Sequence, residues 1–240
     1  MRDLLVLWDV DQTLVNAGGL SAHLYGLVFA ELFGRELPGI APMAGRTDRA
    51  IIRDTLTLAG VRDPYRHVDA FVAGLAREAP AFGERVRTRG RALPGAAAAL
   101  AALAGLADRA AGCIVQSVLT GNIRPLAEAK LGMLGLAGHL NLGVGAYGDA
   151  HEVRAELVHL ARGKAARAYS TDFGAAATVL VGDTPYDVGA ALATGARAVA
   201  VATGSCQAAE LAAAGAHAVL PDLTDTPRVI DAILTRGQGA

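Results

Sequence analysis

The sequence has few cysteines and lacks several motifs that carry well-known chemistry. Cys113 and Cys206 are the only two cysteines in 240 residues, too few for a disulfide framework or a zinc site. The six histidines form no H-x-x-x-H pair, and no serine stands in a G-x-S-x-G sequence. These absences argue against histidine-based metal binding, against a serine nucleophile and against catalysis by cysteine.

The sequence also lacks long basic segments and long uncharged apolar segments. The net charge is −1 and there is no long basic segment, so the sequence lacks the electrostatic footprint of nucleic-acid binding. No uncharged apolar run approaches the roughly 20 residues that a membrane helix needs. Asp3 and Asp9 interrupt the first apolar segment, which argues against a signal peptide. We therefore expect a cytoplasmic monomer or homodimer with no nucleic-acid or membrane partner.

The sequence does contain a large fraction of apolar residues, and strand-like segments alternate with helix-like segments along much of it. Hydrophobic residues make up 52% and charged residues 19%, which indicates a globular protein with a substantial core. From Pro94 onward, strand-like and helix-like segments alternate, which predicts an α/β fold with a Rossmann-like parallel sheet covered by helices on both faces. Residues 16–90 show helical periodicity only. We expect a core domain from residues 1–15 and 91–240, with 16–90 inserted as a helical cap domain.

The periodicity and the positions of glycine and proline give expected bounds for each element. Helices are predicted over 20–33, 46–59, 64–80, 82–89, 96–106, 124–134, 152–168, 186–194, 208–214 and 227–234. Strands are predicted for the apolar run that begins at Leu4 and over 113–119, 140–144, 178–181, 197–201 and 217–220. Residues 236–240 are predicted to be frayed.

The first predicted strand ends abruptly in two acids. Asp9 and Asp11 follow the run from Leu4, and side-chain alternation would point both carboxylates the same way. Two like charges about 4 Å apart repel by roughly 4 kcal/mol at an intermediate dielectric constant. A divalent cation would offset that repulsion. The alternative is that both acids only cap a strand-to-loop transition.

Two later strands also end in polar residues. Thr120, Gly121 and Asn122 follow one of them, and a hydroxyl beside backbone amides that lead into a helix suits an anionic oxygen. Asp183 and Asp187 follow another and lie four residues apart at a helix start. Ordinary helix capping is the alternative at both places. The carboxyl ends of parallel strands are where ligands bind in such sheets, so the three groups together predict one site.

These three motifs resemble those of the haloacid dehalogenase-like hydrolases. Asp9-Val-Asp-Gln-Thr-Leu14 is similar to the first motif of that family, usually Asp-x-Asp-Gly-Thr-Leu. Gln12 departs from it at what we take to be the least demanding position. Thr120 matches the second motif, and Gly182-Asp-x-x-x-Asp187 the acidic last motif. The order and intervals are also family-like, and the resemblance covers essentially the whole chain.

The resemblance implies a Mg²⁺-dependent phosphatase that forms an aspartyl-phosphate. Asp9 would be the nucleophile, and Asp11 would protonate the leaving oxygen and later activate water. Asp9, the backbone carbonyl of Asp11 and Asp183 would hold Mg²⁺, with Asp187 as a further ligand or close by. Thr120 would bind phosphoryl oxygens, and the backbone of Gly121 and Asn122 would bind the substrate beside it.

The basic residue of the family is harder to assign. It usually appears as Lys-Pro at the start of the helix before the last motif, and that dipeptide is absent here. Arg154 lies where this helix is predicted to begin and is our first choice. Lys164, farther along the same helix, is the second. Lys130 follows the second motif and is expected to have a surface role.

A segment of the predicted cap suggests a substrate contact. Gly45-Arg-Thr-Asp48 resembles the cap segment that approaches the substrate in phosphoglycolate phosphatase-like members. We hypothesise that Arg46 binds an anionic substrate group, because a guanidinium suits a carboxylate or a phosphate. The alternative is a plain helix start that Thr47 or Asp48 caps.

The expected substrate is a small phosphorylated metabolite, such as phosphoglycolate or a sugar phosphate. In the family, dehalogenating members lack an acid at the position of Asp11, so this acid argues against a haloacid dehalogenase. A phosphoglucomutase-like phosphotransferase and a catalytically silent binding protein remain open. A literal G-x-G-x-x-G over 143–148 is interpreted as a loop, because the preceding strand is weak and Asp149 would crowd a pyrophosphate.

Overall fold

A computed structural model describes residues 3–107 and 113–235 of the chain. Its centre is a five-stranded sheet in the order β4-β1-β5-β6-β7. All neighbouring strands in it are parallel, which confirms the predicted α/β class. The strands are β1 (Leu4–Trp8), β4 (Ile114–Val118), β5 (Thr178–Gly182), β6 (Arg197–Val201) and β7 (Ala218–Leu220). The segment 236–240, predicted to be frayed, lies outside the described residues.

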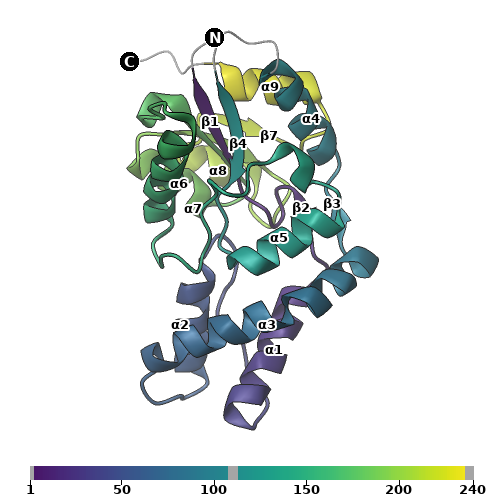
Figure 1. Ribbon diagram of the computed structural model, residues 1–240, viewed down its shortest axis with the longest axis vertical. Coiled ribbons are helices and arrows are strands. Elements are labelled where there is room, and N and C mark those ends of the chain that lie inside the picture. Colours follow the sequence, from purple (N-terminus) through teal and green to yellow (C-terminus); the bar gives the residue numbers. More distant parts are fainter. Residues whose placement is uncertain (1–2, 108–112, 236–240) are drawn as a thin grey trace.

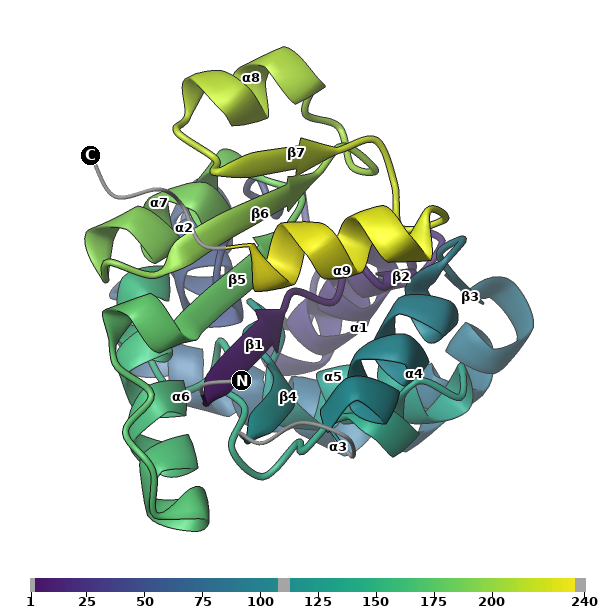
Figure 2. The same ribbon diagram turned by 90° about the horizontal axis from the view of Figure 1, so that it is seen from above.

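Helices cover both faces of this sheet, as Figure 2 shows. Because side chains alternate along each strand, one strand supplies apolar groups to two separate clusters. One cluster holds Val6 and Trp8 of β1, and the other holds Leu5 and Leu7. The first packs under α4 (Ala96–Ala107), α5 (Arg124–Met133) and α9 (Thr226–Leu234). The second packs under α6 (Arg154–Tyr169), α7 (Pro185–Ala193) and α8 (Ala208–Ala213).

The segment after β1 forms three helices beyond the carboxyl edge of the sheet (Figure 1). They are α1 (Leu20–Phe33), α2 (Asp48–Leu58) and α3 (Tyr65–Arg89), and together we call them the helical layer. They share one apolar cluster, which includes Phe29, Ile52 and Phe71. Ile123 and Leu126, at the start of α5, belong to the same cluster. The helical layer therefore packs on a helix that also covers the sheet.

One long helix replaces the two that were predicted over 64–80 and 82–89. α3 runs from Tyr65 to Arg89 with Pro80 inside it. Pro80 lies on the exposed side, whereas Ala79 and Phe82 on either side of it are buried in the same cluster. The apolar stripe is continuous across the proline, so packing maintains the helix where local propensity predicts a break.

The predicted strand at 140–144 is wrong. The chain forms a short 3₁₀ turn, η1 (Ala137–His139), followed by tight turns. The Asn141 side chain accepts a hydrogen bond from the amide of Gly143 at 3.1 Å, a local turn that competes with extended structure. Only Ala146 makes a β-bridge, with Leu119.

Two very short strands had no sequence signal. β2 (Val15–Asn16) and β3 (Arg91–Ala92) pair antiparallel at the places where the chain enters and leaves the helical layer. Two residues are too few to show a period. A second 3₁₀ turn, η2 (Ala175–Ala177), precedes β5.

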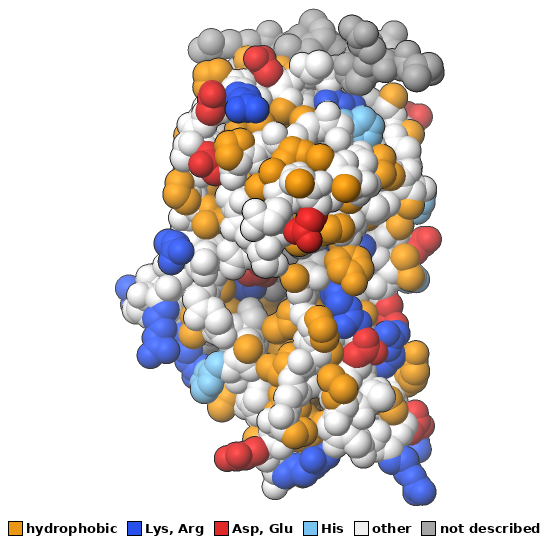
Figure 3. Space-filling model, turned by 180° about the vertical axis from the view of Figure 1, so that it is seen from behind, with side chains coloured by type: hydrophobic (Ala, Val, Ile, Leu, Met, Phe, Trp, Pro, Cys, Tyr) orange, Lys and Arg blue, Asp and Glu red, His pale blue; other side chains and the backbone are white. Residues whose placement is uncertain are grey.

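The surface carries charges of both signs. On the face that Figure 3 shows, Lys and Arg side chains are interspersed with Asp and Glu over the lower part of the molecule, without a stripe of one sign. Among the described residues, no helix combines the length and apolar character that a membrane crossing requires.

Candidate active site

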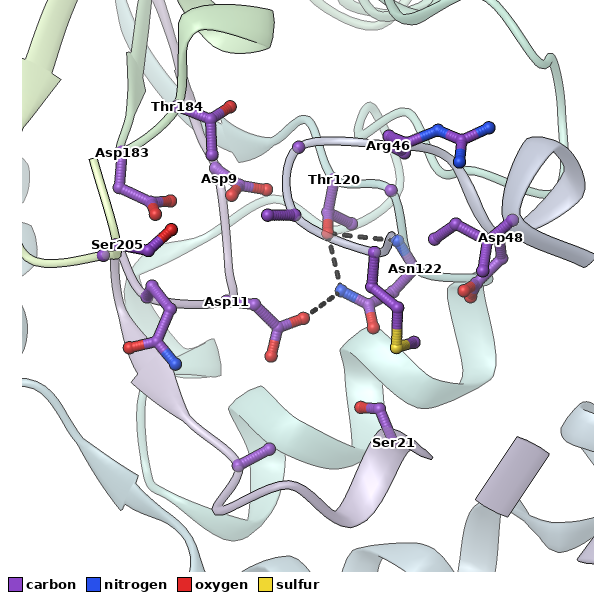
Figure 4. Close-up of a pocket in the computed structure, with 18 of the residues that line it drawn as sticks. Asp9, Asp11, Ser21, Arg46, Asp48, Thr120, Asn122, Asp183, Thr184 and Ser205 are labelled. Atoms are coloured by element: carbon purple, nitrogen blue, oxygen red, sulfur yellow. Dashed lines mark hydrogen bonds between the residues drawn. The ribbon is translucent and has the colours of Figure 1, made fainter. Parts of the chain in front are cut away.

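The sheet order brings the three predicted motifs together. β1 lies between β4 and β5, and all three run in the same direction. Asp9 and Asp11 follow β1, Thr120 follows β4, and Asp183 follows β5, so their side chains meet at one edge of the sheet. They line a cavity of about 510 Å³ between this edge and the helical layer (Figure 4).

Three of the acids form a compact cluster. Oxygens of Asp9, Asp183 and Asp187 lie within 4.8 Å of one another, and all three residues are buried. Burial raises the pKa of Asp9 to about 7, and its acidic neighbours add to this while Arg154 opposes it. Burial, with repulsion from Asp9, likewise raises the pKa of Asp183 to about 8. The cluster therefore holds more negative charge than the protein itself compensates.

Arg154 supplies the positive charge nearest to this cluster. Its Nη2 lies 2.8 Å from Asp9 and 2.6 Å from Asp187. Burial lowers the pKa of Arg154, but the carboxylates of Asp187 and Asp9 raise it by more than burial lowers it, so the net shift is upward. Nη2 also donates to the carbonyl of Leu119 at 3.2 Å. Nε is buried and has no hydrogen-bond partner among the described residues.

Asp187 has a second task at the start of α7. Its Oδ2 accepts from the amide and the hydroxyl of Thr184, at 3.1 and 2.6 Å, which completes a capping box. Its Oδ1 faces Arg154. By contrast, Asp183 accepts one side-chain hydrogen bond, from Thr13 at 3.1 Å. Asp9 and Asp183 therefore have more free carboxylate capacity for a metal ion than Asp187 has.

The second candidate cation lies elsewhere. Lys164 donates to the carbonyl of Gly145 at 2.7 Å and is not among the residues that line the cavity. The structure thus brings Arg154, but not Lys164, to the acidic cluster.

Lys130 is the residue that sequence reasoning misplaced. The expected surface role is wrong, because its side chain is fully buried on the inner face of α5. Its ammonium group donates to both carboxylate oxygens of Asp11, to Asn122 Oδ1 at 2.7 Å and to Ser21 at 3.3 Å. A signal was present in the sequence: Lys130 falls four residues after Leu126, on the apolar stripe of that helix.

The loop after β4 is held tightly. Thr120 Oγ1 accepts from the Asn122 side chain at 2.7 Å, which leaves the hydroxyl proton free to be donated. Asn122 also donates to Asp11 at 2.7 Å (Figure 4). A Cβ on Gly121 would lie 1.9 Å from the backbone oxygen of Arg46, so only glycine fits between this loop and the segment that leads into α2.

Arg46 borders the cavity, but its charge has partners on the helical layer. Its guanidinium is ion-paired with Asp54 and donates to the carbonyls of Pro42 and Ala50. In Figure 4 it points away from Asp11. Thr47 is the N-cap of α2, as expected if residues 45–48 are a plain helix start, the alternative to a substrate contact.

Two smaller interpretations have clear outcomes. Gln12 adopts a φ of 60°, in the left-handed region that favours glycine, so its position is demanding rather than undemanding. The segment 143–148 is a loop and opens no helix, because α6 begins only at Arg154. A Cβ on Gly148 would meet the backbone oxygen of Gly121 at 1.8 Å, so this glycine serves close backbone packing.

Comparison with known proteins agrees with this architecture. The family model described as haloacid dehalogenase-like hydrolase matches residues 6–192. The chain therefore belongs to the haloacid dehalogenase-like hydrolase family. No curated protein sequence matches the chain.

Solved structures show the same fold at low sequence identity. A predicted phosphatase from Clostridium acetobutylicum is 15% identical with a TM-score of 0.68, over 96% of this chain and 100% of that one. A hydrolase from Pseudomonas syringae is 19% identical with a TM-score of 0.66, over 98% and 100%. A candidate β-phosphoglucomutase from Thermotoga maritima is 18% identical with a TM-score of 0.59, over 96% and 100%.

Proposed function

We propose that this protein is a metal-dependent phosphatase that hydrolyses a small phosphate monoester through an aspartyl-phosphate on Asp9. The observation that carries the proposal is the buried set of Asp9, Asp183 and Arg154, with Asp11 and Thr120 at the same cavity. A carboxylate nucleophile, an acid two residues later and a phosphate-binding hydroxyl are the groups that this chemistry requires.

The acidic cluster fits a divalent cation. Among the described residues, Arg154 is the one cation that is ion-paired with this cluster, and it contacts Asp9 and Asp187 but not Asp183, so negative charge remains uncompensated. Carboxylate oxygens are the ligands that Mg²⁺ prefers. We assign Asp9, Asp183 and the backbone carbonyl of Asp11 to the metal, with Asp187 positioning Arg154. When bound, Mg²⁺ would offset the charge of the carboxylates and of the phosphoryl oxygens.

In the first half of the reaction, a carboxylate oxygen of Asp9 attacks phosphorus. The oxygen–phosphorus bond to the leaving group breaks, and Asp11 donates a proton to the departing oxygen. The Thr120 hydroxyl and the backbone amide of Gly121 donate to the phosphoryl oxygens, and the Arg154 guanidinium adds positive charge beside Asp9. These donors are fixed before the substrate arrives, so little reorganisation is needed in the transition state.

In the second half, Asp11 removes a proton from a water molecule. The water oxygen bonds to phosphorus, the bond to Asp9 breaks, and inorganic phosphate leaves. The helical layer covers this edge of the sheet and limits access of bulk water to the aspartyl-phosphate.

A phosphate-release assay tests the proposal. Wild type and Asp9→Asn are compared on a panel of small phosphate esters, each with Mg²⁺ and with EDTA. We expect release only by wild type with Mg²⁺. Asp69→Asn is the matched control, because Asp69 pairs only with Arg49 on the helical layer and should retain full activity. Equal release by Asp9→Asn would exclude the aspartyl-phosphate route.

The phosphoglucomutase-like alternative is favoured only by shared fold. In a mutase the aspartyl-phosphate would pass to a second sugar phosphate rather than to water. Transfer from a labelled ester to an added sugar phosphate, in place of release as inorganic phosphate, would favour this alternative.

A further inference from the structure

The cavity is lined differently on its two sides. The carboxyl edge of the sheet contributes the acids, Thr120 and Arg154. The helical layer and the segments that lead into it contribute mainly small and apolar side chains. These are Ala17, Ala22, Met43, Ala44 and Ile51. If Asp9 attacks phosphorus at the sheet edge, the rest of the substrate faces this second group of residues.

Positive charge on the lining is already matched by acids. Among the described residues that line the cavity, Arg46 and Arg154 are the only arginines, and no lysine is present. Arg154 faces Asp9 and Asp187. Arg46 is ion-paired with Asp54 and points away from Asp11 (Figure 4).

Lys130, behind this lining, is also paired. Its ammonium group is bound to both oxygens of Asp11 at 2.8 and 2.6 Å. It is fully buried and does not line the cavity. It therefore has no free charge to offer to a substrate.

Negative charge, in contrast, does border this region. Asp48 lines the cavity, and its carboxylate accepts from Tyr25 Oη at 2.6 Å and from the amide of Ile123 at 2.8 Å. Both donors are uncharged, so they satisfy the oxygens without cancelling the charge. The N-terminus of α1, next to Gly19, contributes only a partial positive charge of roughly half an elementary charge.

We propose that the group bonded to the transferred phosphate is not anionic, for example a sugar, a polyol or another small alcohol, with no carboxylate and no second phosphate. An anionic group there would be desolvated close to the Asp48 carboxylate and without an unpaired cation to bind it, which is costly. This inference rests on the proposed phosphatase function, and it disfavours phosphoglycolate among the substrates that the sequence suggested.

Three esters that differ mainly in one terminal group provide the test. Phosphoglycolate carries a terminal carboxylate, hydroxyethyl phosphate a neutral hydroxyl and phosphoethanolamine a terminal ammonium. We expect kcat/KM for hydroxyethyl phosphate to exceed that for phosphoglycolate by about tenfold or more, because an unmatched negative charge opposes binding. Phosphoethanolamine should also exceed phosphoglycolate, because its ammonium can face the Asp48 carboxylate. Equal or faster turnover of phosphoglycolate would overturn the inference.

Binding separates this inference from the proposed function. Asp9→Asn cannot form the aspartyl-phosphate, so the Kd of each ester with this variant is measured by calorimetry without turnover. The same order of affinity supports the inference even if wild type releases no phosphate, in which case only the phosphatase proposal fails. Tightest binding of phosphoglycolate contradicts the inference, whatever the turnover.

A variant tests whether charge pairing at Arg46 sets the preference. Asp54→Asn removes the partner of Arg46, and Asp54 is partly exposed, so the fold should tolerate the change. We expect the preference for the neutral ester over phosphoglycolate to shrink at least threefold. Asp69→Asn, which unpairs Arg49 on the same layer, should leave it unchanged. An unchanged ratio in Asp54→Asn would show that pairing at Arg46 does not control selection.

Discussion

Lys130 and Asp11 form a charge pair that joins a buried helix face to the cavity at the carboxyl edge of the sheet. The ammonium donates to both oxygens of a carboxylate whose side chain is 40% exposed, whereas the lysine has no exposed surface. Asn122 contacts both partners. In the proposed mechanism Asp11 first gives its proton to the leaving group, and Lys130 then holds the resulting carboxylate in place to accept a proton from water in the second half-reaction.

Replacing this lysine should affect catalysis more than binding. For Lys130→Met we expect kcat to fall by roughly tenfold to 100-fold, because a general base loses its positioning partner. KM should change less than about threefold, because Lys130 does not touch the substrate. Since hydrolysis is slowed more than phosphorylation, the steady-state fraction of aspartyl-phosphate should rise. Rapid acid quench of turnover with labelled ester measures that fraction.

The chain contains two lysines, so the second is a natural control. Lys164→Met removes an ammonium that contacts the carbonyl of Gly145 and the ring of Tyr147, outside the cavity lining, and activity should stay within about twofold of wild type. The idea of a positioning role fails if Lys130→Met lowers activity without any change in aspartyl-phosphate level.

Arg154 should matter for stability as well as for turnover. Arg154→Ala leaves Asp9 and Asp187 buried without a cation, and loss of one partner of a buried pair costs about 3–5 kcal/mol. Urea unfolding in EDTA measures the loss, and Arg167→Ala, at an exposed position on the same helix, should cost less than about 0.5 kcal/mol. Equal midpoints for the two variants would contradict this account.

Asp48 should make stability depend on pH. Burial raises the pKa of Asp48 from 3.8 to about 6, and hydrogen bonds from Tyr25 and Ile123 only partly oppose this. The folded protein therefore binds this proton more tightly than the unfolded chain does. Its stabilising contribution is complete below about pH 4 and is lost as pH rises through 6, by roughly 3 kcal/mol.

The Asp48→Asn variant isolates this contribution. The unfolding free energy of wild type minus that of Asp48→Asn should fall as pH rises from 4 to 7 in EDTA. Taking the difference removes the titration of every other group that both proteins share. A difference that stays constant with pH would rule out a buried, titrating Asp48.

A single methyl group should disturb the contact between the sheet edge and the helical layer. In Gly121→Ala the new Cβ would lie 1.9 Å from the Arg46 backbone oxygen, so the backbone must move. We expect a loss of about 3 kcal/mol. Gly132→Ala is the control: it is exposed in α5, with nothing within 4 Å of a Cβ, and should gain about 0.5–1 kcal/mol. Denaturant midpoints compare the two.

The sequence was most informative where a local pattern decides the structure. Apolar runs that end in polar residues predicted the strands, and parallel order then predicted that Asp9, Thr120 and Asp183 would meet at one edge. These predictions need only the side-chain period and the direction of the strands.

Where partners come from distant parts of the chain, the sequence was less informative. A lysine in a helix is expected to face solvent, and the charge that allows burial of Lys130 comes from Asp11, 119 residues away. The continuity of α3 through Pro80 depends in the same way on side chains of the neighbouring helices. The left-handed conformation of Gln12 had no signal in the glutamine itself, and only the glycine that the resembled motif usually has at this position indicated it.

The position of α5 limits how the helical layer could be exchanged among related enzymes. The start of α5 packs into the helical layer through Ile123 and Leu126. The buried face of the same helix positions Lys130 next to Asp11. A graft of residues 17–90 from a relative would replace the surface on which α5 rests and so shift the lysine that holds the acid. Exchange of substrate range by recombination should therefore succeed only when the transplanted segment brings its own version of 123–133 with it.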